Sequence, residues 1–249
     1  MKTLFLAWQD RGPSRAWFPI GRLEADTKAN NYHFCYTVGA RQASERAGLQ
    51  PLTSFPNFEK EYESHELFPL FQNRVIDPHR KDFAQYLEWL DLDSKHADPI
   101  EILAVSGGER QTDNLEVFPK IEKAADDSFR CRFFLHGLRH ASQAARLRAE
   151  TLRAGESLRV AIELNNPETG LALQLESADY EMVGWAPRYL IRDLVHAVAD
   201  APSVAAKIVR VNEAPAPANR RYLVEFSGRW PANHEPMTDE VFKPLCRHA

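Results

Sequence analysis

Apolar and polar positions alternate over three short runs near the start of the chain. In the first run Leu4, Leu6 and Trp8 share one side. The three runs cover residues 2–9, 17–23 and 32–36. A period of two is typical of a strand with one buried face, and short turn-rich links favour hairpins. The pattern therefore predicts an antiparallel meander.

Helical spacing follows the meander. Between residues 82 and 92, Phe83, Leu87 and Leu90 recur at intervals that place them on one face of a helix. The other elements predicted before residue 120 are helices over 40–47, 64–73 and 99–105, with Ser64 as N-cap of the second, and a strand over 115–118. The meander with these helices forms the first predicted domain.

Alternation resumes after a polar, unpatterned stretch at 120–128. Leu158, Val160 and Ile162 point to one side of a predicted strand. The elements expected in this half are strands over 129–137, 157–164, 171–175, 183–187, 207–211 and 222–226, and helices over 141–152 and 187–200. This order predicts a small, mostly antiparallel barrel with one or two helices. The fold class is therefore α+β, with domains at 1–122 and 129–249.

Composition limits the class of protein. Of the 249 residues, 44% are hydrophobic and 27% charged, which is typical of a globular chain. No apolar run approaches the roughly 18 residues that indicate a membrane span. Cys35, Cys131 and Cys246 are isolated and odd in number, which argues against a disulfide framework and against a paired-cysteine zinc site. We expect a cytoplasmic protein without a metal or cofactor.

Positive charge is concentrated in the second half. The whole chain has a net charge of -4, but residues 129–166 contain seven arginines and three glutamates. A locally basic module of this kind suits contact with phosphate groups, although charged clusters are more often simply solvated.

Sequence signatures of catalysis are missing from the chain. It contains no phosphate-binding glycine loop, no dinucleotide fingerprint and no nucleophile elbow. His136 and His140 have a spacing that could bind metal on a helix, but Gly137 lies between them in a strand-like run. We therefore expect a non-enzymatic protein with no catalytic residues and no metal ligands.

The stretch VGWAPRYL, residues 183–190, combines a ring, a cation and a phenol where a strand is predicted to lead into a helix. Single-stranded nucleic acid binds such surfaces, because bases stack on rings and guanidinium groups pair with phosphates. Trp185, Arg188 and Tyr189 are the candidates here. The alternative for Trp185 is burial against the following helix.

Three blocks of the second half resemble the HIRAN domain family: LHGLRHA (135–141), LRVAIELNNPETGLALQL (158–175) and VGWAPRYL. The resemblance covers about residues 129–230 and implies an OB-like barrel that binds single-stranded DNA or DNA ends. The resemblance implies that nucleic acid binds at Arg139, His140, Asn165, Asn166, Glu168, Thr169, Trp185 and Arg188. The pattern described above adds Tyr189 to these candidates. The DNA-end-binding form has tyrosine at position 140 and a Tyr-Asp pair at 168–169, where this chain has His140, Glu168 and Thr169. The resemblance therefore implies the fold more strongly than it implies strict 3′-end recognition.

Residues 1–122 resemble the first N-terminal subdomain of HipA-type toxins through IGRLE (20–24), NYHFCYT (31–37), LFPLFQNRVID (67–77) and DPIEILAVSGG (98–108). The resemblance implies a protein-binding adaptor without kinase activity. Two hypotheses follow. In the first, the adaptor binds a protein and the second domain binds nucleic acid. In the alternative, the chain is a toxin–antitoxin-type regulatory partner in which both domains bind protein.

Overall fold

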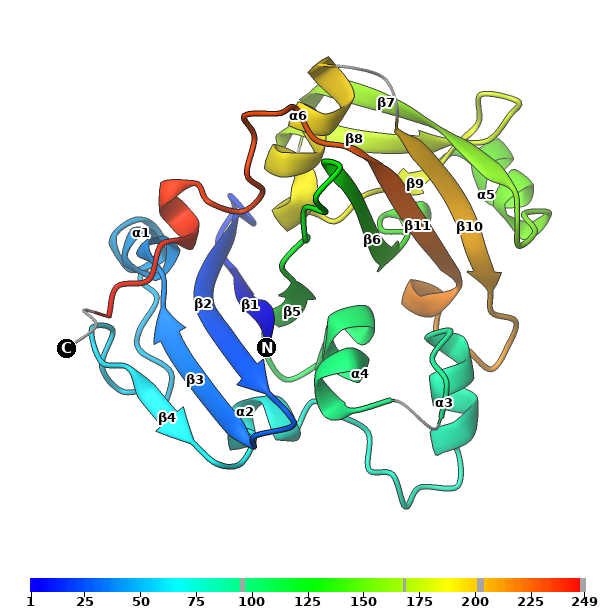
Figure 1. The fold of residues 1–249 in the computed structure, drawn as a ribbon. Coiled ribbons are helices and arrows are strands. Elements are labelled where there is room, and N and C mark those ends of the chain that lie inside the picture. Colours follow the sequence, from blue (N-terminus) through cyan, green and yellow to red (C-terminus); the bar gives the residue numbers. More distant parts are fainter. Residues whose placement is uncertain (95–96, 168, 201–203, 247–249) are drawn as a thin grey trace. The chain divides into compact units, whose positions relative to one another are not determined.

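The structure is a computed structural model that describes residues 1–94, 97–167, 169–200 and 204–246 (Figure 1). It divides into two compact units. The first unit contains Met1–Lys120 together with residues 237–246, and the second contains Ile121–Pro236. The C-terminal segment was predicted to belong to the second domain, and the structure instead places it in the first.

A five-stranded antiparallel sheet forms the frame of the first unit, in the order β4-β3-β2-β1-β5. Its strands are β1 (Lys2–Gln9), β2 (Trp17–Asp26), β3 (Asn31–Tyr36), β4 (Tyr62–Ser64) and β5 (Leu115–Pro119). Strands β1, β2 and β3 are consecutive neighbours joined by hairpins, which is the predicted meander. The α+β class is therefore confirmed.

Aromatic side chains fill the core of the first unit. Phe34 is fully buried, and its ring stacks on Phe55 with centroids 3.9 Å apart. Tyr36 is also fully buried, and its hydroxyl donates to the Phe55 carbonyl oxygen at 2.9 Å and accepts from the Leu52 amide at 2.6 Å. Burial raises the pKa of Tyr36 to about 12. The one polar atom of this ring is thus satisfied inside an apolar core.

Four helices belong to the first unit: α1 (Val38–Ala47), α2 (Pro69–Gln72), α3 (Phe83–Trp89) and α4 (Pro99–Ser106). The carboxylate of Asp98 caps α4 by accepting from the Glu101 amide at 2.8 Å, and Gly107, with φ of 73°, ends it. The predicted helix over 64–73 is wrong at its start. Ser64 ends strand β4, and the helix begins at Pro69, a residue suited to a first helical turn.

The C-terminal segment is tied to β3. Its short helix η4 (Glu240–Phe242) packs Phe242 against Phe5, with ring centroids 4.8 Å apart. Cys246 forms a disulfide with Cys35 across 211 positions of sequence. The expectation that the cysteines argue against disulfides is wrong for this pair, because distance along the chain does not reveal proximity in the fold. Cys131 remains a buried free thiol.

A six-stranded antiparallel sheet forms the second unit, in the order β6-β11-β10-β7-β8-β9. Its strands are β6 (Ser128–Phe134), β7 (Ser157–Asn166), β8 (Gly170–Glu176), β9 (Met182–Trp185), β10 (Ala205–Val211) and β11 (Tyr222–Arg229). The described residues form no closed barrel, which corrects the prediction. The continuation of β6 meets the end of β9 only at one isolated bridge between His136 and Trp185, and a single bridge is not a strand ladder.

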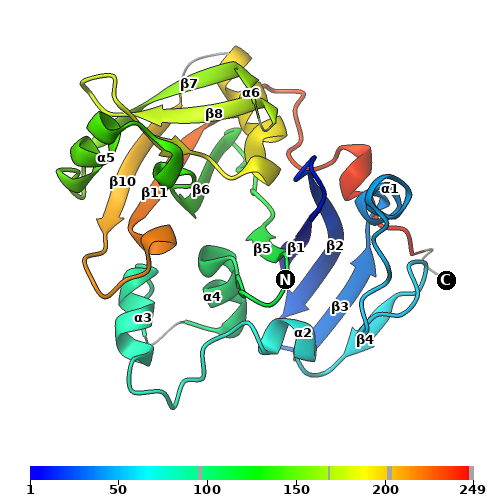
Figure 2. The same cartoon turned by 180° about the vertical axis from the view of Figure 1, so that it is seen from behind.

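The remaining elements of the second unit are short helices: η1 (Leu138–His140), α5 (Gln143–Glu150), η2 (Arg188–Leu190), α6 (Ile191–Asp200) and η3 (Ala218–Arg220). Figure 2 shows this unit from behind, with α5 and α6 on its surface. The helix predicted over 187–200 exists, but its first turn is the 3₁₀ helix η2, which Pro187 precedes as N-cap. In the described part of the chain, no helix has the length and apolar character needed to span a membrane.

Candidate nucleic-acid interface

The first and third sequence blocks meet through backbone hydrogen bonds. The His136 amide donates to the Trp185 carbonyl oxygen at 3.0 Å, and the Trp185 amide donates to the His136 carbonyl oxygen at 3.0 Å. His136 lies just before η1, which contains Arg139 and His140, and Trp185 ends β9. Residues almost fifty positions apart are therefore fixed side by side at the end of the second sheet.

Gly137 allows the Trp185 indole to lie directly against the main chain. A Cβ atom at this position would stand 2.4 Å from Trp185 Cε3, closer than non-bonded atoms approach. Gly137 also has a φ of 75°, a conformation that residues with side chains rarely adopt. Both facts require glycine here. The sequence GLRH thus begins with the residue that makes room for the ring.

A carboxylate on β7 holds the polar edge of the same ring. Trp185 Nε1 donates to Glu163 Oε2 at 2.9 Å. The pairing register places Gln174 of β8 opposite Trp185. Side chains at directly opposed positions share a face of the sheet, and the Gln174 side chain is also hydrogen-bonded to Glu163. Trp185 is only partly buried. Gly137 contacts the face of its ring, and Glu163 binds the polar edge.

Glu163 is the charged centre of this arrangement. Burial by itself raises its pKa, but the hydrogen bonds from Asn166, Trp185 and Gln174 outweigh burial and hold the pKa of Glu163 below its ordinary value of 4.5. The carboxylate is therefore ionised at neutral pH. A negative charge in the middle of the site keeps phosphate away from this position and favours groups that donate hydrogen bonds.

The β7–β8 turn is joined to Glu163 through Asn166. Asn166 Nδ2 donates to Glu163 Oε2 at 3.0 Å, while Asn166 Oδ1 accepts from the Thr169 amide at 3.2 Å and from Thr169 Oγ1 at 3.1 Å. Asn166 and Thr169 thus stabilise the turn, which is the commonest function of such residues in this position. Asn165 is exposed, and Glu168 lies outside the described residues.

Two exposed arginines lie on η1 and α5, the elements that follow Gly137 in the chain. Arg139 Nε donates to His140 Nε2 at 2.9 Å, and Arg146 Nη1 from α5 donates to the Arg139 carbonyl oxygen at 3.4 Å. Neither arginine forms an ion pair with any residue that the structure describes. Arg148, by contrast, is paired with Asp179 at 2.7 Å and with Glu156. Arg139 and Arg146 therefore keep their charge available to an anion.

Arg188 and Tyr189 follow Trp185 by three and four residues in η2. Both side chains are partly buried, and each takes part in interactions within the protein. The expected α-helical N-terminus at this point is replaced by the 3₁₀ turn, which aligns fewer free amides than an α-helix does. The structure thus brings the segment of Arg139 and His140 to Trp185, and Glu163 links Trp185 to Asn166 and Thr169. Arg188 and Tyr189 are partly buried.

Two residues of this cluster were missed by sequence reasoning. Glu163 was only a polar position in an alternating strand, and Arg146 was one of several helix arginines. The strand alternation does contain a signal for Glu163, since it predicts that its side chain points away from Ile162. No pattern in the sequence indicates that Trp185 is its partner.

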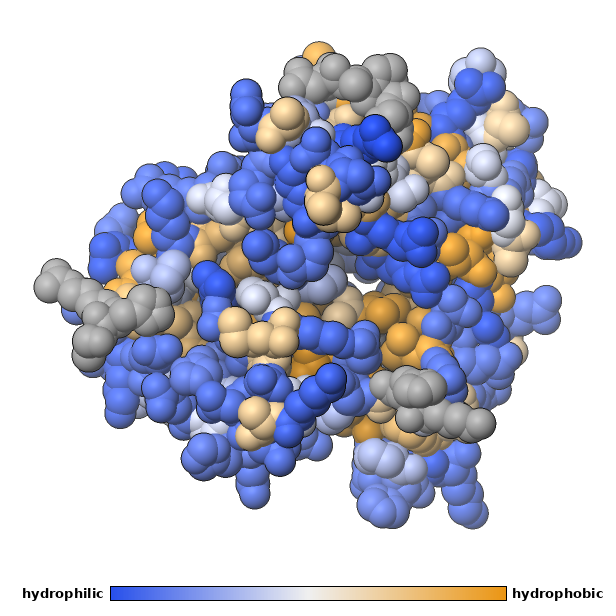
Figure 3. Space-filling model, viewed as in Figure 1, coloured by the Kyte–Doolittle hydropathy of each residue, from blue (hydrophilic) through white to orange (hydrophobic). Residues whose placement is uncertain are grey.

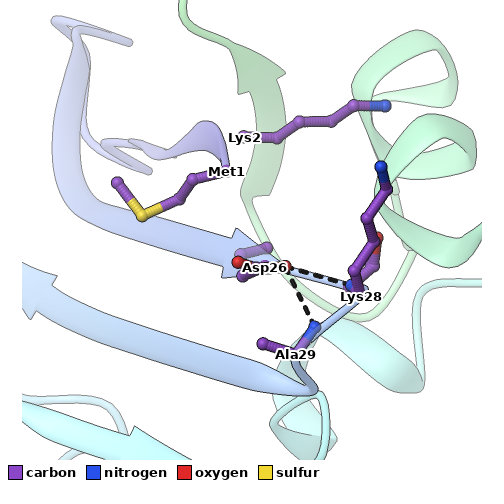
Figure 4. A pocket seen from close by; sticks show the side chains of 7 residues that line it. Met1, Lys2, Asp26, Lys28 and Ala29 are labelled. Atoms are coloured by element: carbon purple, nitrogen blue, oxygen red, sulfur yellow. Dashed lines mark hydrogen bonds between the residues drawn. The ribbon is translucent and has the colours of Figure 1, made fainter.

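A separate pocket lies in the first unit, at the turn between β2 and β3. Its volume is about 400 Å³, and it is lined by Met1, Lys2, Ala25, Asp26, Thr27, Lys28 and Ala29. Figure 4 shows the Asp26 carboxylate accepting hydrogen bonds from the backbone amides of Ala29 at 3.0 Å and Lys28 at 3.1 Å. The bond from Ala29 is the main cause of the lowered pKa of Asp26. This carboxylate stabilises a turn, and the pocket contains no predicted site residue.

Comparisons with known proteins give little further information. No protein-family model and no curated protein matches the chain. One solved structure, of a protein from Lactobacillus plantarum determined in a structural genomics programme, is 12% identical, covers 42% of this chain and 93% of its own, and has a TM-score of 0.33. A likeness at that score carries no argument about fold or function.

Proposed function

We propose that the second unit binds single-stranded nucleic acid at the surface around Trp185, and that the protein acts by binding rather than by catalysis. The observation that carries the proposal is the meeting of three distant segments, which contain Arg139, Glu163 and Trp185, around one indole ring. A partly exposed ring near guanidinium groups that form no ion pair with the described residues offers both contacts that a single strand requires.

The charges divide this surface into two sides. Arg139 and Arg146 supply positive charge on the η1–α5 side, where the sugar–phosphate backbone would lie. Glu163 supplies negative charge on the β7 side, where it would repel phosphate. Neutral donors, such as base amino groups or a terminal hydroxyl, would face Glu163 and the Asn165–Gly170 turn. Trp185 lies between the two sides.

The proposal is tested by fluorescence anisotropy of the full chain with labelled single-stranded DNA, duplex DNA and RNA over a salt series. Replacing Arg139 and Arg146 by alanine together should weaken binding and reduce the salt slope by roughly 1.4, since each phosphate contact to a single strand contributes about 0.7. Arg229→Ala is the matched control. Arg229 is also exposed, but it lies opposite Ser128, the first residue of β6, roughly 20 Å of strand away from η1, and its guanidinium is 3.9 Å from the Asp126 carboxylate.

A parent-like affinity and salt slope in the double variant would overturn the interface. Blocking the 3′ hydroxyl with phosphate tests end recognition separately. Because Thr169 already donates within the turn, we expect end blocking to have a small effect compared with the loss of the two arginines. In the same assay Trp185→Phe should weaken binding, because it releases the ring from Glu163.

The first unit would serve as a protein-binding adaptor, which is what its resemblance to the HipA subdomain implies. The alternative, that the second unit also binds protein, is favoured by one observation. Leu164, next to the Asn165 turn, is 72% exposed, and Leu147 of α5 is 56% exposed. Exposed large apolar side chains near a candidate site suit a protein partner. If the chain binds none of the nucleic acids, this alternative replaces the first proposal.

A further inference from the structure

A histidine and two glutamates gather on the outer face of the first sheet. On β3, Tyr32 and Phe34 are buried and His33 points the other way. On and beside β4, Tyr62 packs towards the Phe34 and Phe55 rings, so that Glu61 and Glu63 point outwards with His33. The pairing register places His33 directly opposite Glu63. Two-residue alternation on neighbouring strands thus produces the cluster.

The distances in the cluster fit shared coordination better than direct hydrogen bonding. His33 Nδ1 lies 3.4 Å from Glu61 Oε1 and 3.6 Å from Glu63 Oε1, beyond the usual range for a charged hydrogen bond. Ligand atoms bound about 2.0–2.2 Å from a tetrahedral ion stand about 3.3–3.6 Å apart. All three ligand atoms lie within 4.8 Å of one another, and Glu63 is 68% exposed and free to rotate inwards.

Two nearby cations of the described residues have other contacts. Arg22 on the same face is paired with Glu24. Lys60 Nζ lies 5.4 Å from the centroid of the Tyr62 ring. The Glu61 and Glu63 carboxylates both face the His33 imidazole and repel each other, and a bound cation would relieve this repulsion. Figure 3 shows a mostly hydrophilic surface over β3 and β4.

We propose that His33, Glu61 and Glu63 form a binding site for a divalent transition-metal ion of the zinc class. One imidazole and two carboxylates are a ligand set that such ions accept, whereas Mg²⁺ and Ca²⁺ prefer oxygen ligands alone. Three protein ligands leave a fourth position, which faces solvent because β4 is the edge strand of its sheet. The ion would join the three-residue strand β4 to β3.

The test is isothermal titration of zinc and of magnesium into the full chain after removal of bound metal by a chelator. We expect one zinc ion per chain, no comparable uptake of magnesium, and an increase in melting temperature with zinc. His33→Ala and Glu63→Gln should each lower the zinc affinity by more than about ten-fold, the smallest typical effect of removing even an outer-shell partner. Cobalt should give the strong visible absorption of a tetrahedral site.

His79→Ala is the matched control, because the His79 imidazole is exposed and faces a single carboxylate, that of Asp77, at 2.9 Å. It should leave zinc affinity unchanged. Failure of the parent chain to take up zinc overturns the proposal, as does equal uptake by the His33 and Glu63 variants. If circular dichroism shows that His33→Ala does not fold, the zinc affinity of the near-isosteric Glu63→Gln variant tests the proposal instead.

Discussion

The two sheets of this protein use their aromatic residues in different ways. In the first unit, Phe34, Tyr36 and Phe55 are completely buried and pack against one another, and the only polar atom among their side chains is hydrogen-bonded inside the core. In the second unit Trp185 is only partly buried at the end of the sheet and is held by a charged residue, Glu163. The first arrangement specifies a stable core, and the second presents a ring at the surface.

The comparison shows why aromatic content alone does not identify a binding surface. A ring contributes to recognition only if part of it stays in contact with solvent while its position is fixed. For Trp185 the fixing contacts are a glycine beneath the ring and a carboxylate at its edge. For Phe34 the surrounding rings remove all solvent contact, so the side chain contributes to stability alone.

The largest effect is expected from Phe34→Ala. Removing a fully buried phenyl ring from the core of the first unit should lower the free energy of unfolding by about 3–5 kcal/mol. Hydrogen exchange followed by mass spectrometry should show faster exchange in β2 and β3, with the second unit little changed. Equally faster hydrogen exchange in both units would show that they unfold together, which would contradict separate roles for the two sets of aromatic residues.

The next effect concerns the C-terminal segment. Replacing Cys246 by serine should destabilise the first unit by about 2–4 kcal/mol, because the disulfide with Cys35 restricts the unfolded chain. Urea unfolding under non-reducing conditions measures this difference.

Thiol labelling checks the bond itself. In the native chain no cysteine should react quickly, because burial raises the pKa of the Cys131 thiol to about 12. Denaturation should expose one thiol, and reduction should expose all three. Three reactive thiols without reduction would contradict the disulfide.

The smallest effect is the pH dependence of the Trp185 site. Because the folded state lowers the pKa of Glu163, its ionised form stabilises the fold above the ordinary pKa of 4.5, and this contribution is lost as the pH falls through the lower folded value. The stability of Glu163→Gln should therefore be below that of the parent at neutral pH and approach it in acid. Urea unfolding at several pH values tests this. A difference that is independent of pH would assign Glu163 a packing role only.

Local pattern predicted most of the elements because burial on one face leaves a period in the sequence. The run 2–9 became β1, and helices were found near 82–92 and 99–105, where apolar spacing or capping residues are clear. The pattern failed between 64 and 73. Three residues of β4 are too few to show a period, and Ser64 suits a strand end as well as a helix cap.

For the candidate site, the sequence alone determined which residue types are present and which local turns they make. Gly137, the Asn166–Thr169 turn and the polar side of β7 follow from short-range chemistry. Only the tertiary structure decided that Trp185 binds Glu163, that Cys246 reaches Cys35, and that His33 faces Glu61 and Glu63. These contacts join residues far apart in the chain. Strand order and register set them, and both depend on how whole faces are buried rather than on any short segment.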